Sequence, residues 1–276
     1  MDKRHIAFLK ERFPKFFYKV AGSYVLARIV TELDRFNYIK CILFKKPYFG
    51  TLMLAGQTWT SRESHMRALI EAEILRKGPQ NGFNVLEMGT WAGNSAILWA
   101  NVIKRKGVKD GLVVCVDAWD SYITEGHTAG VNKATLIMDR AARREKIFKL
   151  FLHNIKTSGH SDTIKPFKGF TREVLRSLRP GFFDLIYVDA SHLYSGVLHD
   201  LRWALQLVRP GGIICGDDLE LQKKDVDVVQ TEEHKERDLL ICPVTGREYH
   251  PGVTLAVAEM FGDRVVCQEG FWYVRR

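Results

Sequence analysis

The chain has 276 residues, of which 46% are hydrophobic and 26% charged, and its formal net charge is +9 at pH 7. This composition excludes a disordered or fibrous protein and predicts one sizeable core with an extension. No apolar run is long enough to span a bilayer, and the first residues lack the apolar stretch of a signal peptide, so we expect a cytoplasmic protein.

Residues 1–50 combine many lysines and arginines with aromatic side chains. Such a surface suits nucleic acid, an anionic lipid surface or an acidic glycan. The simpler alternative is a solvated face over an amphipathic helix, and no RNA-binding signature accompanies the charge. We expect residues 1–60 to form a helical extension that contributes to an acceptor site or to a subunit contact in a homo-oligomer.

Residues 83–95 carry the most informative pattern in the chain. An apolar run ends at the acid Glu87, and Gly89 and Gly93 follow at a spacing of four before an apolar helical pattern begins. This predicts a buried parallel strand, a tight loop that approaches a ligand, and a helix whose first amides point into the loop. The spacing is neither the Gly-x-Gly-x-x-Gly of dinucleotide folds nor a P-loop. An acid at the strand end favours a ligand with positive charge, such as the sulfonium of S-adenosylmethionine.

The next segments repeat the strand–helix alternation. Residues 111–117 form a second apolar strand ending at Asp117, a carboxylate placed to bind ribose hydroxyls or, alternatively, to cap a helix. Residues 121–158 indicate a loop and a basic helix, and residues 162–168 a short third strand. The loop at Phe170 and Thr171 then lies where an adenine slot is expected, although Thr171 is equally suited to cap the following helix.

Two further strands end in acids. The fourth ends at Asp189 within Asp-Ala-Ser-His-Leu-Tyr-Ser-Gly-Val, and the fifth ends at Asp217 and Asp218 within Gly-Gly-Ile-Ile-Cys-Gly-Asp-Asp-Leu. Together with the glycine loop, these motifs resemble those of the class I S-adenosylmethionine-dependent methyltransferases, in the branch of macrolide-sugar and rhamnosyl O-methyltransferases. The chain departs from that pattern at Ala190, where glycine is usual, and at Leu219, where tyrosine is usual. The resemblance covers about residues 60–276.

The resemblance implies a doubly wound, Rossmann-like α/β fold with a seven-stranded sheet, mostly parallel with one antiparallel strand. A helix over residues 253–261 and a terminal hairpin complete the pattern. We expect residues 61–276 to form the methyltransferase domain, with residues 219–250 as a lid-like insertion, because a long insertion after a strand ending in two acids commonly covers a site. The predicted cofactor-binding residues are Glu87, Gly89, Thr90, Gly93, Asn94, Ser95, Asp117, Phe170, Thr171 and Asp189.

The three acids at the ends of strands four and five predict a metal site. Asp189, Asp217 and Asp218 would repel one another unless a hard divalent cation such as Mg²⁺ lay among them, and that cation could lower the pKa of a substrate hydroxyl. Either His192 or Asp189 could then accept the proton. The structural alternative is that these residues cap a helix, pack, and end a strand. His234, Cys242, His250 and Cys267 have no ligand-like spacing, and we expect them to be scattered.

These observations predict an O-methyltransferase acting on a hydroxyl of a sugar, glycan or related small molecule. One alternative is an RNA-directed methyltransferase, supported only by the basic extension, since the Asn/Asp-Pro-Pro-Tyr/Phe of base methylation is missing after the fourth strand. The other is a basic nucleic-acid- or membrane-binding module with a vestigial nucleoside pocket. The intact strand-end acids argue against it.

Overall fold

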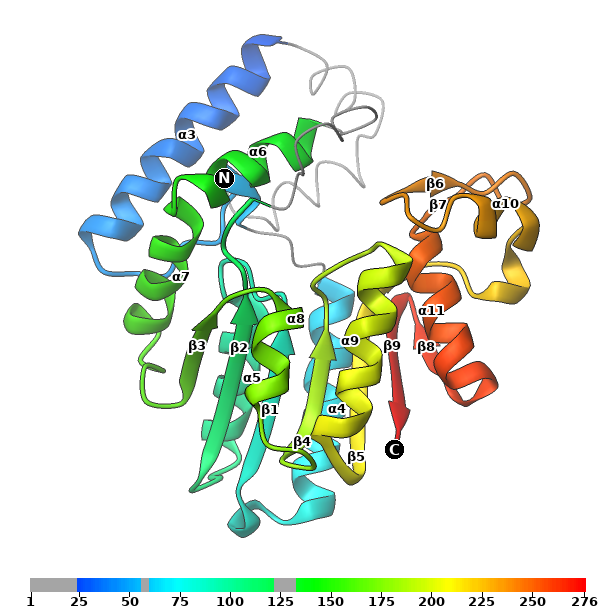
Figure 1. Cartoon of the computed structure of the whole chain (residues 1–276). Helices are drawn as coiled ribbons and strands as arrows, with labels where there is room; N and C mark the ends of the chain where they lie inside the picture. The colour runs from blue at the N-terminus through cyan, green and yellow to red at the C-terminus, as the bar shows by residue number, and fades with distance from the viewer. Residues whose placement is uncertain (1–23, 56–59, 122–132) are drawn as a thin grey trace.

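A computed structural model describes residues 24–55, 60–121 and 133–276. Its centre is a seven-stranded sheet in the order β3-β2-β1-β4-β5-β9-β8, with helices on both faces (Figure 1). The strands are β1 (Phe83–Met88), β2 (Gly111–Asp117), β3 (Ile164–Lys168), β4 (Phe183–Val188), β5 (Val208–Leu219), β8 (Val266–Gln268) and β9 (Gly270–Arg275). The predicted fold is confirmed.

Strand directions place all the acid-ended strands at one edge. β1 pairs in parallel with β2 and β4, and β4 pairs in parallel with β5. Only β9 runs antiparallel to its neighbours β5 and β8, as the terminal hairpin predicted. From β1 the chain continues to β2 and β3 on one side and then to β4 and β5 on the other, so the strand order reverses at β1. Ligands in such sheets bind beyond the carboxyl ends of the strands at this point.

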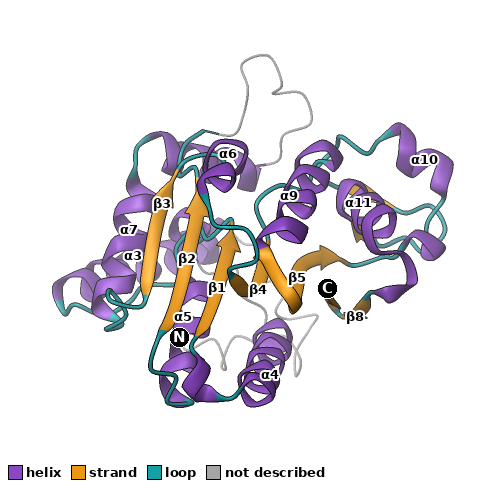
Figure 2. Cartoon of the chain, turned by 60° about the horizontal axis from the view of Figure 1, so that its bottom comes forward, coloured by secondary structure: helices purple, strands orange, loops and turns teal. Residues whose placement is uncertain are grey.

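The helices follow from the apolar periodicity between the strands. Two-sided alternation along β1 sends Val85 into one core and Leu86 into the other. Figure 2 shows α4 and α5 on one face of the sheet and α9 and α11 on the other. The longer helices are α3 (Tyr24–Leu43), α4 (Thr60–Lys77), α5 (Asn94–Arg105), α6 (Lys133–Arg143), α7 (Lys146–Thr157), α9 (Tyr194–Leu207) and α11 (Pro251–Phe261).

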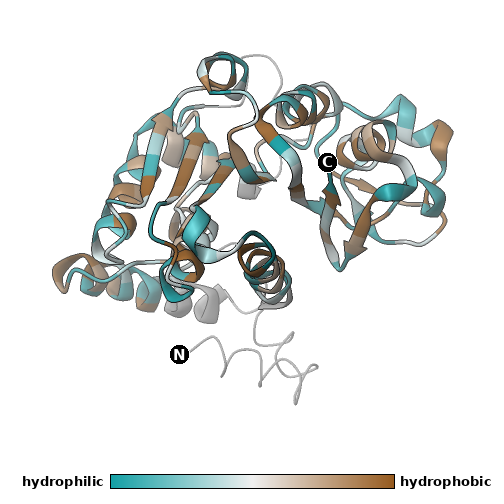
Figure 3. Ribbon diagram, turned by 90° about the horizontal axis from the view of Figure 1, so that it is seen from below, coloured by the Kyte–Doolittle hydropathy of each residue, from teal (hydrophilic) through white to brown (hydrophobic). Residues whose placement is uncertain are grey.

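The two cores are filled mainly by aliphatic and aromatic side chains, and the central strands are coloured mainly as hydrophobic in Figure 3. On the α9 face, Leu201 packs fully buried among strand residues. A buried leucine of this kind contributes about 1.5–3 kcal/mol through burial alone, and its truncation to alanine costs about 2–5 kcal/mol. The sheet is therefore a rigid platform for the loops at its edge.

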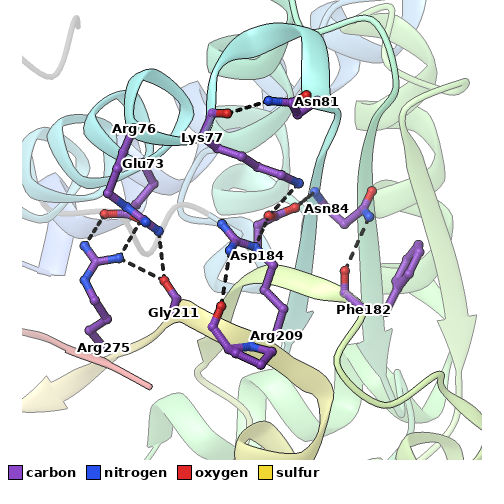
Figure 4. Close-up of polar contacts among 11 residues, drawn as sticks. Glu73, Arg76, Lys77, Asn81, Asn84, Phe182, Asp184, Arg209, Gly211 and Arg275 are labelled. Carbon is purple, nitrogen blue, oxygen red and sulfur yellow. Dashed lines mark hydrogen bonds and ion pairs between the residues drawn. The ribbon is translucent and has the colours of Figure 1, made fainter.

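A buried polar network fastens the opposite, amino-terminal edge of the sheet (Figure 4). Asp184 of β4 pairs with Lys77 at 2.7 Å and with Arg209, and it accepts a hydrogen bond from the backbone N–H of Asn84 at 2.7 Å. Its side chain is 1% exposed, so removing one partner would leave an uncompensated buried charge, which costs several kcal/mol. This network ties α4 to the sheet far from the predicted site.

The segment predicted as one loop and one basic helix contains two helices in its described part, α6 and α7. Glu145, in a left-handed backbone conformation, separates them. The segment predicted as a lid-like insertion contains regular structure: α10 (Val228–Glu233), the two-stranded sheet of β6 (Leu240–Ile241) and β7 (Glu248–Tyr249), and a small core of its own. With six residues in α10 and two in each strand, these elements are too short to show a periodic apolar pattern.

The described part of the N-terminal extension packs on the domain. Tyr48 is fully buried, and its backbone N–H donates to the side chain of Asn154 in α7 at 2.8 Å. The outward face of α3 is apolar, with Phe36 68% and Leu43 73% exposed. Within the described ranges, no helix is both long and apolar enough to cross a membrane.

Candidate active site

The glycine loop between β1 and α5 is held in a shape that requires its two glycines. Gly89 and Gly93 both have left-handed backbones, with φ of 80° and 84°. A side chain at Gly89 would place its Cβ 2.1 Å from the carbonyl oxygen of Asp189, whereas one at Gly93 would meet Phe151 of α7 at 2.9 Å. The glycines therefore let the loop lie against the end of β4 and against α7. The sequence analysis had explained the two glycines by the close approach of a ligand alone.

Glu87 is buried at the end of β1 and binds the first turns of α5. Its carboxylate accepts hydrogen bonds from Ser95 Oγ at 2.7 Å and from Trp99 Nε1 at 2.9 Å. Burial raises the pKa of Glu87 to about 7, although these hydrogen bonds act in the opposite direction. The structure thus joins two predicted cofactor residues, Glu87 and Ser95, and each already has a partner in the protein.

Asp117 organises the same loop from β2. One carboxylate oxygen accepts the backbone N–H groups of Thr90 and Trp91, both at 2.9 Å, and the other accepts that of Trp119 at 2.7 Å. Burial raises the pKa of Asp117 despite these three bonds. The structure therefore brings Asp117 beside Thr90 and the glycines, as predicted, and gives it a role in holding the loop.

The loop after β3 lies next to Asp117. The backbone N–H of Gly169 donates to the carbonyl of Asp117 at 2.9 Å, so Phe170 and Thr171 follow directly beside the second strand's end. Phe170 occupies the cap position of the short helix α8 (Thr171–Val174) without a side-chain cap bond, and the Arg172 guanidinium lies 4.7 Å from its ring centre. Asn94 begins α5 at the other side of the glycine loop.

Asp189 sits at the end of β4 among charged and polar groups. Tyr187 Oη donates to it at 3.0 Å, and the guanidinium of Arg62 from α4 lies 3.8 Å away. Burial and the nearby carboxylate of Asp218 hold the pKa of Asp189 well above its usual value, outweighing Arg62. The carboxyl group therefore binds a proton more readily than an ordinary aspartate does.

Asp217 and Asp218 face different partners although they are adjacent. The register between β5 and β9 shifts after Gly216, and Asp218 has a left-handed backbone with φ of 63°. A non-glycine residue held in that conformation costs about 1–3 kcal/mol and is typical of functional sites. The bulge directs Asp217 to Arg62, with which it forms an ion pair, and Asp218 to His192.

His192 is held between two carboxylates. Its Nε2 lies 3.1 Å from Asp218, and its Nδ1 lies 2.7 Å from Asp238, which comes from the 219–250 insertion. Burial by itself lowers the pKa of His192, but Asp218 and Asp238 outweigh it and hold that pKa well above its usual value. The same pairing keeps the pKa of Asp218 below its usual value although burial opposes it. This arrangement favours the protonated form of His192.

His250, at the start of α11, lies against this pair. Its ring centre is 4.4 Å from that of His192, and its Nδ1 is 3.2 Å from both carboxylate oxygens of Glu220. Among the described residues, the groups of possible metal ligands that contain His250 include none of His234, Cys242 and Cys267, so these four residues form no common site, as expected. His250 lies instead at the site of Asp218 and Glu220. Its distance in sequence from Asp218 concealed a contact that the fold of the insertion creates.

The structure thus gathers most of the predicted site residues in two connected groups. The first surrounds the glycine loop, and the second contains Asp189, His192 and Asp218, whose ligand atoms lie within 4.8 Å of one another. Asp217 is not part of that group, because Arg62 takes its carboxylate. Sequence reasoning missed Arg62, Tyr187, Asp238 and His250. Of these, only Tyr187 could have been found from the sequence. It lies two residues before Asp189 in the predicted strand, so the two side chains are expected on the same face of the sheet.

Comparison with known proteins supports a methyltransferase domain in this chain. Residues 86–219 match the family model described as a methyltransferase domain, and residues 18–137 match that of protein-L-isoaspartate(D-aspartate) O-methyltransferase. No curated protein sequence gave a match. The first family match spans β1 to β5 and so contains the glycine loop and all four strand-end acids after it.

Two solved structures share the fold at low identity, and a third is similar with a lower TM-score. The O-methyltransferase NovP is 16% identical over 78% of this chain and 79% of its own, with a TM-score of 0.54. The calicheamicin methyltransferase CalS11 is 12% identical over 92% and 93%, with a TM-score of 0.52. An O-methyltransferase from Bacillus cereus, solved with SAH, is 16% identical over 99% and 97%, with a TM-score of 0.48. Residues 86–219 thus match a methyltransferase domain, and the sheet order is the one expected of a class I S-adenosylmethionine-dependent methyltransferase.

Proposed function

We propose that the chain transfers a methyl group from S-adenosylmethionine to a hydroxyl oxygen of a sugar, glycan or related small molecule, with the help of a divalent cation. The observation that carries this proposal is the convergence of Asp189, His192 and Asp218 directly beside the glycine loop. Proton-accepting groups and cation ligands at that place suit activation of a hydroxyl, and the motif of base methylation is missing.

The residues around the glycine loop fit a cationic cofactor. Glu87, Asp117, Asp189 and Asp218 make this edge rich in carboxylates, and S-adenosylmethionine, when bound, supplies the methyl group on a positively charged sulfur. Glu87, Gly89, Thr90, Gly93, Asn94, Ser95, Asp117, Phe170, Thr171 and Asp189 would hold it. The main contribution of the protein is to position the reactants, because holding two reactants in line provides much of the rate acceleration of a displacement reaction.

A divalent cation also fits the second group of residues. Two carboxylates, Asp189 and Asp218, converge with His192, and hard cations take carboxylate oxygens as ligands. The third acid of the predicted set, Asp217, would have to leave Arg62 to join them. We therefore place Asp189 and Asp218 first among the ligands and propose for Asp217 the role of holding Arg62 beside Asp189.

His192 and Asp189 are the two groups that could accept the hydroxyl proton. Asp238 fixes the imidazole through Nδ1, so Nε2 is the nitrogen that faces Asp189 and Asp218. The negative charge of Asp218 favours a proton on Nε2, so neutralisation of that charge would make His192 a better proton acceptor. Asp189, with its raised pKa, is the alternative proton acceptor.

The 219–250 insertion is proposed to form part of the acceptor site. It reaches the site through Asp238, and Glu236 accepts hydrogen bonds from the backbone N–H and the hydroxyl of Ser195, each at 3.0 Å, at the start of α9. The helical extension lies on the other side of the sheet's carboxyl edge (Figure 1). We propose it for acceptor binding, for contact with an anionic surface or for a subunit contact.

A direct test is methyl transfer from isotope-labelled S-adenosylmethionine to a panel of glycans, polyols and RNA, with and without chelator. The proposal expects label in hydroxyl-bearing acceptors, loss of transfer with chelator and recovery with Mg²⁺. Transfer to RNA alone would replace the acceptor class, and full activity in excess chelator would remove the cation from the mechanism.

A further inference from the structure

We propose that the outward side of α3 binds the surface of an anionic lipid bilayer. The region combines large exposed apolar side chains with lysines at the end of the helix, and we call it the α3 face. Its residues are Leu33, Phe36, Lys40, Leu43, Phe44 and Lys45. The inference is independent of the methyl-transfer chemistry and concerns where the protein is held.

The inward side of α3 holds the helix on the domain. Asp34 accepts hydrogen bonds from Tyr48 Oη at 2.8 Å and from the backbone N–H of Thr51 at 2.7 Å. The rings of Tyr38 and Tyr48 lie 5.1 Å apart in an edge-to-face arrangement. Asp34 and Tyr38 are four residues apart and therefore share one side of the helix. These contacts fix the orientation of α3, so its other side points away from the domain.

The outward side of α3 carries a row of large apolar side chains. Leu33, Phe36, Lys40 and Leu43 follow one another at spacings of three or four residues, which places them along one side of a helix. Leu33 is 57% exposed, Phe36 68% and Leu43 73%, and Phe44, directly after the helix, is 67% exposed. Single exposed apolar residues are common, but a contiguous group of this kind marks an interaction surface.

Lysines lie at the end of this apolar row. Lys40 is part of the row and Lys45 follows the helix, and neither forms an ion pair with another residue of the described ranges. The neighbouring part of α7 adds positive charge, since His153 Nε2 contacts the carbonyl of Lys46 at 2.9 Å and the exposed Lys156 lies three residues further along α7. Apolar side chains beside lysines are typical of helices that lie in the interface of an anionic membrane.

The acids of α3 do not cancel this charge. Glu32 pairs with Arg35 at 3.2 Å, and Asp34 faces the domain through its bond to Tyr48. A second copy of the α3 face would bring the same positive charge against the first, and like charges repel at close range. Nucleic acid presents mainly phosphate and sugar, which would attract the lysines but leave Phe36 and Leu43 without an apolar partner. A bilayer with anionic headgroups matches both parts of the face.

The experiment is sedimentation of the purified full-length protein with vesicles of phosphatidylcholine, either alone or with about one third phosphatidylglycerol. The wild type should bind the anionic vesicles at least about tenfold more tightly than the neutral ones, and added salt should release it. Phe36→Ser combined with Leu43→Ser should weaken binding to anionic vesicles at least about tenfold, because two apolar side chains are lost from the buried face. Lys40→Gln combined with Lys45→Gln should weaken it about tenfold while binding to neutral vesicles changes little.

Matched control variants change the same kinds of side chain elsewhere. Leu75→Ser combined with Val244→Ser replaces two apolar side chains of similar exposure, 68% and 72%. Lys109→Gln combined with Lys224→Gln removes the same charge from two exposed lysines. Both controls should bind anionic vesicles like the wild type. Urea unfolding should give all four variants a midpoint close to that of the wild type, because the altered side chains are exposed.

Three outcomes would overturn the proposal. The first is a wild type that does not bind anionic vesicles, or an equal loss of binding in the matched controls. The second is a dimer, measured by light scattering without lipid, that becomes monomeric in the Phe36→Ser and Leu43→Ser variant, which would assign the α3 face to a second copy. The third is salt-sensitive binding to RNA that needs Lys40 and Lys45 but not Phe36 and Leu43, in a protein that ignores the vesicles.

Discussion

Glu87 makes the stability of this fold depend on pH in a direction opposite to that of an ordinary salt-bridged acid. The pKa of Glu87 rises from its usual value of 4.5 to about 7 because the carboxyl group is buried. A group with a raised pKa in the folded state contributes stability that is fully present below the unfolded pKa and is lost as pH rises through the folded pKa. Between about pH 4.5 and pH 7, ionisation of Glu87 therefore destabilises the fold progressively.

Glu87→Gln should remove this dependence. At about 1.36 kcal/mol for each tenfold change in proton affinity, the full effect is about 3 kcal/mol, of which about 2.5 kcal/mol falls between pH 5 and pH 8. The glutamine keeps both contacts, since its carbonyl can accept from Trp99 and its amide can donate to Ser95 Oγ. Relative to wild type, the variant should therefore gain about 2.5 kcal/mol of unfolding free energy on going from pH 5 to pH 8.

The assay is urea unfolding of both proteins at pH 5, 6, 7 and 8, with the exposed Glu248→Gln as control. Other titrating groups are common to all three proteins, so they cancel in the differences. A difference between wild type and Glu87→Gln that stays constant with pH would refute the reasoning, because it would mean that Glu87 titrates alike in folded and unfolded chains.

Four further results are expected. Gly89→Ala should destabilise the fold by more than about 3 kcal/mol in urea unfolding, since its Cβ would stand 2.1 Å from the carbonyl oxygen of Asp189, whereas Gly107→Ala, also at positive φ but with open space around it, should cost much less. His192→Ala should lower turnover by about two to four orders of magnitude with little change in cofactor affinity, and undiminished turnover would assign the base to Asp189. Asp238→Ala should lower kcat by about tenfold or more through loss of the bond that orients His192, and an unchanged kcat would show that the insertion does not position the imidazole. Chelator should abolish turnover and added divalent cation restore it, and unchanged turnover would exclude the cation.

The sheet and the glycine loop could be predicted because their signals are local. The central parallel strands β1, β2, β4 and β5 contain apolar runs that end at or directly before an acid or glycine, and parallel strands bring such ends to one edge. The sequence alone therefore predicts that this edge of the sheet carries Asp117, Asp189 and Asp218. The division of residues 133–157 into two helices was not predictable. Glu145 separates them with a left-handed backbone conformation, and glutamate is not a residue type that indicates such a conformation.

The partners of the site acids could not be predicted because they come from distant segments. Arg62 lies 155 residues before Asp217, and His192 meets Asp238 across 46 residues of the chain. No periodicity or motif specifies such pairings, which depend on how α4 and the insertion pack. The different directions of the Asp217 and Asp218 side chains also could not be predicted. In a regular strand they would simply point to opposite faces of the sheet, whereas the bulge after Gly216 turns Asp218 toward His192.

The central claim is that the glycine loop organised by Asp117 binds S-adenosylmethionine, and calorimetric titration of that cofactor into wild type and Asp117→Ala tests it most directly. The account predicts saturable binding of one molecule per chain in the wild type. It predicts at least about tenfold weaker binding in the variant, because the variant loses the acceptor of three backbone N–H groups and the carboxylate placed for ribose. Equal affinity in the two proteins, or no binding to the wild type, would contradict it.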